Sequence, residues 1–385
     1  IMRKSFILIA CLGFLCGISN RVLAQNTTTG AERTTKTITT AVPFLLVAPD
    51  SRSGGMGEAG VAIADDANAM HWNPAQLAFL DKRMGFAMSY SPWLRALGIP
   101  DINLMYLSGY FNTGGKGVIG ASLRYFSLGE IQFTDNLGQP TGSGKPNEFA
   151  IDMAYALPLT GDLSGSISLR FIRSELASNN NVQAADAKPV NSAAGDIAFA
   201  YKKDFKMNGG NGPIPVRFSS GINISNIGPK VSYSASSANR DFIPINMRLG
   251  YAFKFLVDDY NSITFTNDFN KLLVPSEGGR SDKPLLSGIF GSFGDAEGGF
   301  GEEISEFNTS VGFEYWYRDI FAARAGFFYE DAEKGNRKFI TLGAGIRYNV
   351  FGLHFAYLAP LQQNHPLQNT LRFTLTYDFE SAGNE

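Results

Sequence analysis

Three histidines are the first candidates for catalytic side chains, and the chain after residue 24 contains no cysteine that could act as a thiolate nucleophile or metal ligand. The three are His71, His354 and His365. A serine hydrolase would pair one of them with a nucleophile elbow, but no G-x-S-x-G occurs in the chain. Their scattered positions also lack the spacing of a zinc site. We therefore predict no catalytic residues, no metal site, no cofactor and no enzymatic activity.

A glycine-rich string at 55–60, Gly-Met-Gly-Glu-Ala-Gly, matches the G-x-G-x-x-G of dinucleotide-binding loops. That chemistry needs a βαβ unit around the glycines, whereas the rest of the chain shows strand periodicity. We interpret the string as part of a tight turn formed by Gly54, Gly55, Gly57 and Gly60. The acidic run at 65–68 lacks the glycine and glutamate of a calcium loop.

The elements that must position any site are strands with one apolar and one polar face. In the last of them, Leu371, Phe373, Leu375, Tyr377 and Phe379 alternate with Arg372, Thr374, Thr376 and Asp378. Side chains of a strand point alternately to its two faces. A soluble β-protein would bury the apolar face, but aromatic residues at the segment ends, behind a signal peptide, favour the reverse. We expect the apolar face to contact lipid and the polar face to line a lumen.

Fourteen such segments lie between residues 84 and 379, with clear alternation over 242–256. Their connections alternate in length: short at 114–115, 160–161, 207–213, 257–259, 319 and 351, and long at 92–100, 128–145, 177–192, 229–241, 274–304, 332–336 and 360–367. Outer-membrane barrels have short periplasmic turns and long external loops. The pattern predicts an all-β fold, a 14-stranded antiparallel barrel that crosses the cell outer membrane many times, with both termini periplasmic.

The composition of the chain predicts five regions. Residues 1–24 have the basic end, apolar core and cleavage site of a signal peptide, and they contain both cysteines, Cys11 and Cys16. Residues 25–40 are a flexible leader, 41–83 an N-terminal plug or hatch with a helix-like stretch at 59–69, 84–379 the barrel, and 380–385 a C-terminal tail. Without the three basic residues of the signal, 30 of the 33 Lys and Arg remain against 35 Asp and Glu. This excess of acidic residues argues against nucleic acid as a partner.

The longest connection, 274–304, has an apolar centre. It contains Pro284, Leu285, Leu286, Ile289 and Phe290. Loops longer than about 12–15 residues without structure of their own are usually functional or disordered, and exposed apolar residues among polar ones indicate a protein contact. We predict that it is an external loop that binds a partner; the alternative is that it folds inward and constricts the lumen.

The string Asn73-Pro74-Ala75 is the most specific local sequence. Proline removes a backbone donor and disfavours the α conformation of Asn73, so a helix should end here. The string matches the hatch signature of the fatty-acid transporter (FadL) superfamily of outer-membrane barrels, which the chain resembles. Within it, the chain is most similar to the PorV family of Bacteroidota type IX secretion, through residues 41–45, 48–52, 54–57, 73–75 and 90–94.

That resemblance implies a role in protein export. PorV-like proteins bind the C-terminal signal domain of secreted cargo and shuttle it from the translocon to a surface complex that cleaves the signal. The expected partners are these signal domains, a large translocon barrel (SprA-like), the surface attachment or sortase complex, and outer-membrane lipid and lipopolysaccharide. Two alternatives stay open: uptake of long-chain fatty acids or other hydrophobic small molecules, and an enzyme that modifies lipopolysaccharide.

Overall fold

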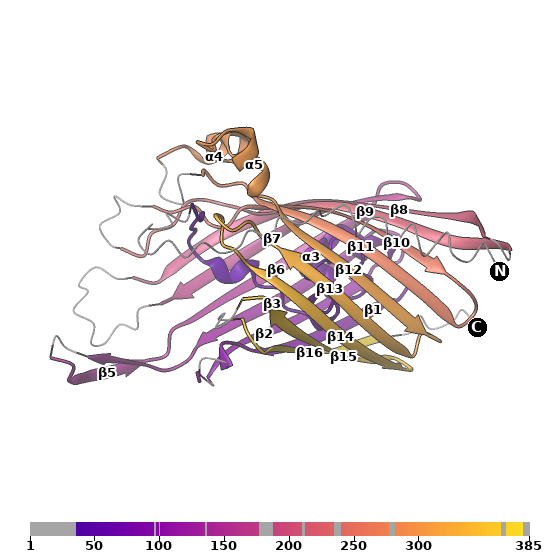
Figure 1. Cartoon of the computed structure of the whole chain (residues 1–385), viewed down its shortest axis with the longest axis horizontal. Coiled ribbons are helices and arrows are strands. Elements are labelled where there is room, and N and C mark those ends of the chain that lie inside the picture. The colour runs from indigo at the N-terminus through magenta and orange to yellow at the C-terminus, as the bar shows by residue number, and fades with distance from the viewer. Residues whose placement is uncertain are drawn as a thin grey trace, which may run out of the picture.

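The computed structural model describes residues 36–379, apart from 96–97, 100, 135–136, 177–187, 210–211, 235–239, 277–281 and 363–366. The predicted signal peptide, most of the leader, the tail and His365 lie outside these residues. Within the described residues, fourteen antiparallel strands close into a barrel (Figure 1). They are β1 (Met84–Pro92), β2 (Ile102–Asn112), β3 (Val118–Leu128), β6 (Asn147–Pro158), β7 (Leu163–Glu175), β8 (Val190–Gly209), β9 (Gly212–Ile227), β10 (Asn246–Leu256), β11 (Asn261–Leu272), β12 (Asn308–Tyr317), β13 (Phe321–Tyr329), β14 (Lys338–Tyr348), β15 (Phe351–Pro360) and β16 (Thr370–Phe379).

The outer surface of this wall is apolar and the inner surface polar. On β16, Phe373 and Leu375 are exposed, whereas Arg372 and Thr374 are buried against the contents of the lumen. The prediction for this strand is therefore confirmed, and exposed apolar rows recur on the other strands. Such a surface is stable where hydrocarbon replaces water around it. None of the helices in the described part of the chain is long and apolar enough to span a membrane.

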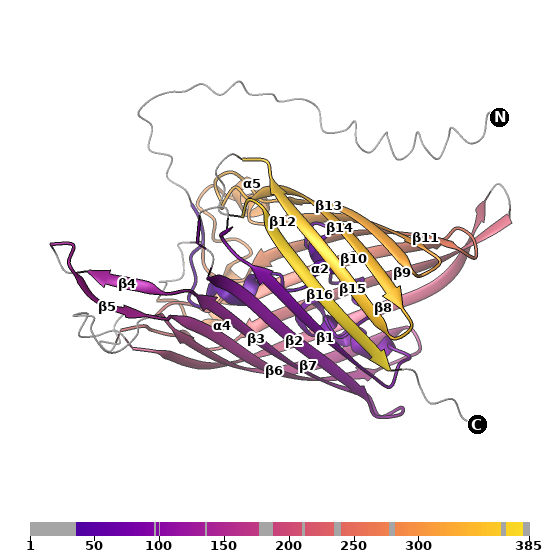
Figure 2. The same cartoon turned by 90° about the horizontal axis from the view of Figure 1, so that it is seen from below.

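The connections sort to the two ends of the barrel. Short turns lie at one end, which we call the inner end, and long loops at the other, the outer end (Figures 1 and 2). Within the loop after β3, strands β4 (Ile131–Thr134) and β5 (Pro140–Gly144) form a separate hairpin. The barrel begins and finishes at the inner end, where Met84 pairs with Phe379.

The plug runs through the lumen from the outer to the inner end. Lys36 lies at the outer end, where its ammonium group contacts Glu302, and the chain reaches β1 at the inner end. The plug holds η1 (Pro43–Leu46), α2 (Ser51–Gly54), α3 (Ala69–Trp72) and η2 (Pro74–Phe79). Both termini lie outside the described residues, so their periplasmic location stays a prediction.

Two local predictions were wrong. The helix-like stretch predicted at 59–69 has turns and irregular backbone up to Asn68. Near its end, the Asp66 carboxylate accepts a hydrogen bond from the Asn68 amide, and this contact competes with helical hydrogen bonding there. The strand predicted at 242–256 begins only at Asn246. Ile243 and Ile245 instead pack with Phe44 of η1 in an apolar cluster that closes the outer end of the lumen.

Candidate functional site

Asn73 fastens the plug to the barrel wall. Its side-chain amide donates to the carbonyl oxygen of Phe199 on β8 at 3.0 Å, and to that of Val61 in the plug at 3.3 Å. Its own oxygen accepts from the Ala75 amide at 3.1 Å. Helix α3 ends at Trp72, and Pro74 begins η2. The string predicted as a helix stop therefore also carries a contact between two parts of the protein.

The predicted glycine turn lies where the plug main chain touches the wall. Gly57 has a φ of +70°, and a Cβ added to it would come within 2.6 Å of the Phe327 carbonyl oxygen on β13. A Cβ on Gly60 would overlap the indole of Trp72. Gly54 and Gly55 lie close to Arg372 and to the backbone of Gly343, respectively. At Gly57 and Gly60 the neighbouring atoms lie too close for a side chain, and the positive φ of Gly57 also favours glycine.

Buried ion pairs hold the plug from the opposite side of the lumen. The Arg52 guanidinium of α2 binds both carboxylate oxygens of Glu314 on β12, at 2.9 and 2.8 Å. Arg324 on β13 contacts the same carboxylate at 2.7 Å, and Arg52 also binds Asp65. Arg372 on β16 pairs with Glu58. Of these residues only Arg372 was predicted to face the lumen, although charged side chains at lumen-facing positions of strands are a usable signal for such pairs.

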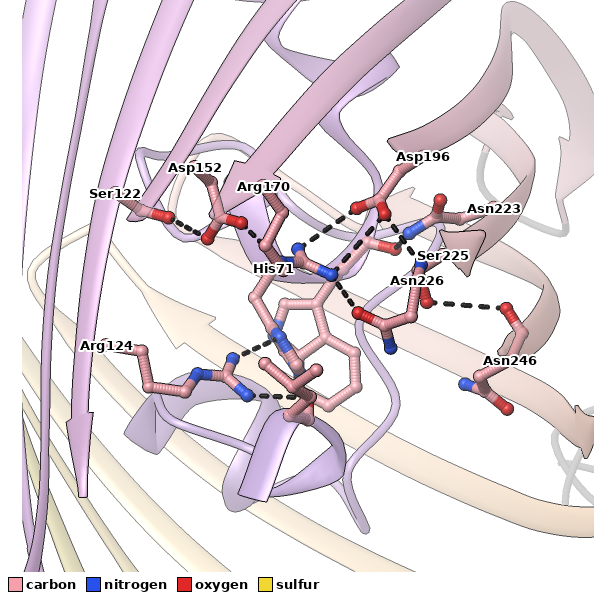
Figure 3. Close-up of polar contacts among 12 residues, drawn as sticks. His71, Ser122, Arg124, Asp152, Arg170, Asp196, Asn223, Ser225, Asn226 and Asn246 are labelled. Carbon is pink, nitrogen blue, oxygen red and sulfur yellow. Dashed lines mark hydrogen bonds and ion pairs between the residues drawn. The ribbon is translucent and has the colours of Figure 1, made fainter. Parts of the chain in front are cut away.

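A second polar network surrounds α3 (Figure 3). Arg170 on β7 binds Asp152, Asp196 and Asn226, and its contact with Asp196 measures 3.0 Å. The amide of Asn223 donates to the Trp72 carbonyl at 2.9 Å. Polar groups removed from water are costly unless they are paired, so this network favours one position of α3 in the lumen.

The two described histidines take part in separate packing arrangements. His71 Nδ1 lies 2.6 Å from the Arg124 guanidinium (Figure 3). Arg248 contacts the His71 carbonyl. Burial and the adjacent Arg124 hold the pKa of His71 well below its usual range, so the imidazole is neutral and accepts a hydrogen bond. His354 on β15 lies beside Arg324 and the ring of Trp316. The structure does not bring these two histidines together.

Two cavities lie at opposite ends of the plug. The outer one, of about 480 Å³, is lined by apolar and charged side chains that include Ile38, Leu46, Phe328, Arg248 and Lys334. The inner one, of about 320 Å³, is more polar and includes Asp65, Lys202, Lys254 and Arg347. The main chain at Met56 lies between the two ends, directly against Gly312 and Gly326 of the wall.

The predicted partner loop folds into two short helices on the outer rim, α4 (Leu285–Gly291) and α5 (Phe300–Ser305) (Figure 1). Pro284 precedes α4 as its N-cap. Leu285 and Ile289 pack on the apolar cluster at the outer end of the lumen. Leu286 and Phe290 point away from it and are exposed. The five predicted residues thus divide into two that attach the loop, two that water reaches, and one that begins the helix.

Ion pairs fix α5 to the barrel. Lys271 of β11 lies 2.7 Å from Glu303 and 2.6 Å from Glu306. Glu302 accepts from Lys334 and from Lys36, both at 2.7 Å. These two hydrogen bonds lower the pKa of Glu302 to about 2. The loop is therefore attached to the rim by charges, while part of its apolar surface stays free.

The free apolar surface is larger than the sequence indicated. Phe290 is 74% exposed and Phe300 81%, and Phe293 and Ile304 are also exposed. Phe300, Phe293 and Ile304 were missed because their neighbours in the sequence are glycine and acidic residues. A cluster of exposed apolar side chains of this kind indicates a contact site.

Several proteins of known structure are similar to this chain. Similar solved structures include the Ralstonia pickettii toluene transporter TbuX (12% identity, 86% of this chain and 98% of that chain, TM-score 0.47), a deltaS2 mutant of the monoaromatic hydrocarbon channel TodX (11%, 86% and 98%, 0.50) and a Pseudomonas aeruginosa FadL homologue (11%, 86% and 98%, 0.45). At these identities the similarity concerns the barrel fold alone. No curated protein matches the chain.

A family model gives a more specific result. The model described as type IX secretion system protein PorV matches residues 30–278, which is more than half of the chain. The match includes the plug and β1 to β11. This protein therefore belongs to the PorV family and is an outer-membrane barrel of the type IX secretion system.

Proposed function

We propose that this barrel binds the C-terminal signal domain of secreted cargo on its outer loops. It then carries the cargo from a large translocon barrel to the surface complex that removes the signal and attaches the cargo to lipopolysaccharide. In this proposal the barrel is a platform and not the export pore, and it has no catalytic role. The plug supports a platform, because ion pairs and hydrogen bonds tie it to β8, β12, β14 and β16.

One observation carries the proposal: the loop of α4 and α5 presents exposed aromatic side chains on a firmly attached support. Burying a phenylalanine side chain contributes about 1.5–3 kcal/mol. Phe290 and Phe300 therefore offer a partner substantial binding energy. The salt bridges of Lys271 and Lys334 order this surface before a partner arrives, which lowers the entropic cost of binding.

The test replaces Leu286, Phe290 and Phe300 by serine in the full-length chain. Co-purification of a cargo signal domain should fall at least tenfold, because three exposed apolar contacts are lost together. Substitution is preferred to deletion of 274–304, because deletion would remove Glu303 and leave the buried ammonium group of Lys271 without this partner. The control is Leu361→Ser, an exposed leucine in another outer loop. Full retention of cargo by the triple variant would refute the role of this loop.

Uptake of hydrophobic small molecules is the second candidate, and the outer cavity is the observation in its favour. Ile38, Leu46 and Phe328 give it an apolar part beside Arg248. If the barrel imports such molecules, a labelled fatty acid should bind and should be lost in Leu46→Asp. The serine variant of the outer loop should leave that binding unchanged, so the two experiments separate the two functions.

A further inference from the structure

The hairpin of β8 and β9 extends past the rest of the barrel at the inner end (Figures 1 and 2). On one side, the last pair between β7 and β8 is Leu163 with Tyr201. On the other, the last pair between β10 and β9 is Phe255 with Val216. In the described residues, 203–209 pair only with β9 and 212–215 pair only with β8. We call these residues the inner ribbon; the sequence had predicted a turn over 207–213.

The two edges of the inner ribbon differ. The Lys202 amide donates to the Asp162 carbonyl at 2.8 Å, away from β9. Because N–H groups of a strand alternate in direction, those of Asp204, Lys206 and Asn208 point to the same side, where no described strand follows. The β9 edge is closed by prolines. Pro213 and Pro215 lack an N–H, and their positions in the register direct their nitrogens away from β8.

The two faces of the inner ribbon also differ. Phe205 and Met207 pair with Val216 and Ile214. This face is therefore apolar beyond Lys203, whose ammonium group pairs with Asp162. Phe205 is 40% exposed and Met207 47%. They follow Tyr201 by four and six residues, about 13–20 Å along the strand, and so lie past the end of β7. The other face carries the ion pair of Asp204 with Arg217, 2.7 Å between Oδ1 and Nε.

We propose that an extended segment of a protein on the inner side of the membrane adds as a further strand to the β8 edge of the inner ribbon. Its carbonyl groups accept from the N–H groups of Asp204, Lys206 and Asn208, as in known cases of strand addition. Its side chains alternate between apolar ones beside Phe205 and Met207 and acidic ones beside Lys206. The prolines of β9 close the second edge, so one barrel takes one such strand. This surface lies at the opposite end from the proposed cargo site and goes beyond that function.

The test compares amide hydrogen exchange of residues 203–209 in the full-length protein in three settings. These are detergent micelles, phospholipid nanodiscs and fragments of the native outer membrane. We expect fast exchange in the first two and at least tenfold slower exchange at Asp204, Lys206 and Asn208 in the native membrane. Strand addition explains this slowing, because the partner's carbonyls would occupy those N–H groups.

Two variants at one position provide matched controls. Lys206→Pro removes the central N–H on the open edge, where proline is compatible with a strand, and should abolish the slowing at Asp204 and Asn208. Lys206→Gln removes the charge, keeps the N–H, and should retain most of the slowing. Equal exchange in all three settings would overturn the proposal. Slow exchange of these amides already in nanodiscs would also overturn the proposal, because lipid would then cover the β8 edge. This comparison uses the unmodified chain, so it does not depend on the folding of a variant.

Discussion

The guanidinium of Arg52 binds both carboxylate oxygens of Glu314, at 2.9 and 2.8 Å, across 262 positions of the sequence. This pair joins the second helix of the plug to a strand in the second half of the barrel. Both side chains are buried and Arg324 shares the same carboxylate. An ion pair thus attaches the plug to a strand of the wall that is far away in the sequence.

Glu314→Gln should release the plug. The substitution leaves Arg52 and Arg324 as adjacent buried cations, and removal of one partner from a buried pair costs about 3–5 kcal/mol. The expected result is a rise in single-channel conductance in planar bilayers as the plug shifts. Asp204→Asn, which breaks an exposed pair with Arg217, should change stability by only about 0–1 kcal/mol. Equal, low conductance in both variants would contradict the assigned role of Glu314.

Gly57→Ala should loosen the plug more than Gly114→Ala does. Both glycines have a positive φ, +70° and +75°, so both substitutions carry a similar backbone strain. Only at Gly57 does the added Cβ meet the wall, 2.6 Å from the Phe327 oxygen; nothing lies within 4 Å at Gly114. We expect Gly57→Ala to lose about 1–3 kcal/mol more stability than backbone strain alone would cost, measured by hydrogen exchange of residues 50–60. Equal losses of stability in the two variants would mean that backbone strain alone accounts for the glycine at position 57.

Asn73→Asp should destabilise the plug more than Asn73→Ala. A carboxylate would place oxygen against the carbonyls of Phe199 and Val61, where the amide now donates. An unsatisfied buried polar group costs about 1–3 kcal/mol, and more when it is charged. Because a protonated carboxyl can donate again, the protection factors of the plug amides, which are corrected for the intrinsic pH dependence of exchange, should be higher at pH 4 than at pH 7 in this variant. The absence of that pH effect would argue against the assigned contacts.

Acidification should detach α5 from the rim. Hydrogen bonds from Lys334 and Lys36 lower the pKa of Glu302 from 4.5 to about 2. A carboxylate with a lowered pKa stabilises the folded loop above its ordinary pKa, and this stabilisation is lost as the pH falls from about 4.5 towards 2. The protection factors of residues 300–305, which are corrected for the intrinsic pH dependence of amide exchange, should therefore fall over this range. Glu302→Gln should have lower protection factors at neutral pH, with less dependence on pH; an unchanged pH dependence of the protection factors would exclude Glu302 as its cause.

Several features were determined by the sequence alone. Alternation of apolar and polar residues is a local property, so residues 371–379 sufficed to predict a strand with lipid on one side. The order of short and long connections predicted the two ends of the barrel. The string at 73–75 predicted both a helix end, through the chemistry of proline, and the family resemblance.

Other features were decided only by the tertiary structure. The alternation of residues predicts that Ile243 lies on one face of a strand. In the structure it lies outside the strand, in the same buried apolar cluster as Phe44 of the plug. The pairing of Arg52 with Glu314 depends on closure of the whole barrel, which no local pattern encodes. The length of the inner ribbon depends on where β7 and β10 stop, and therefore on neighbours in space. Contacts between residues far apart in the chain arise from packing, whereas the face of an isolated strand is fixed by its own sequence.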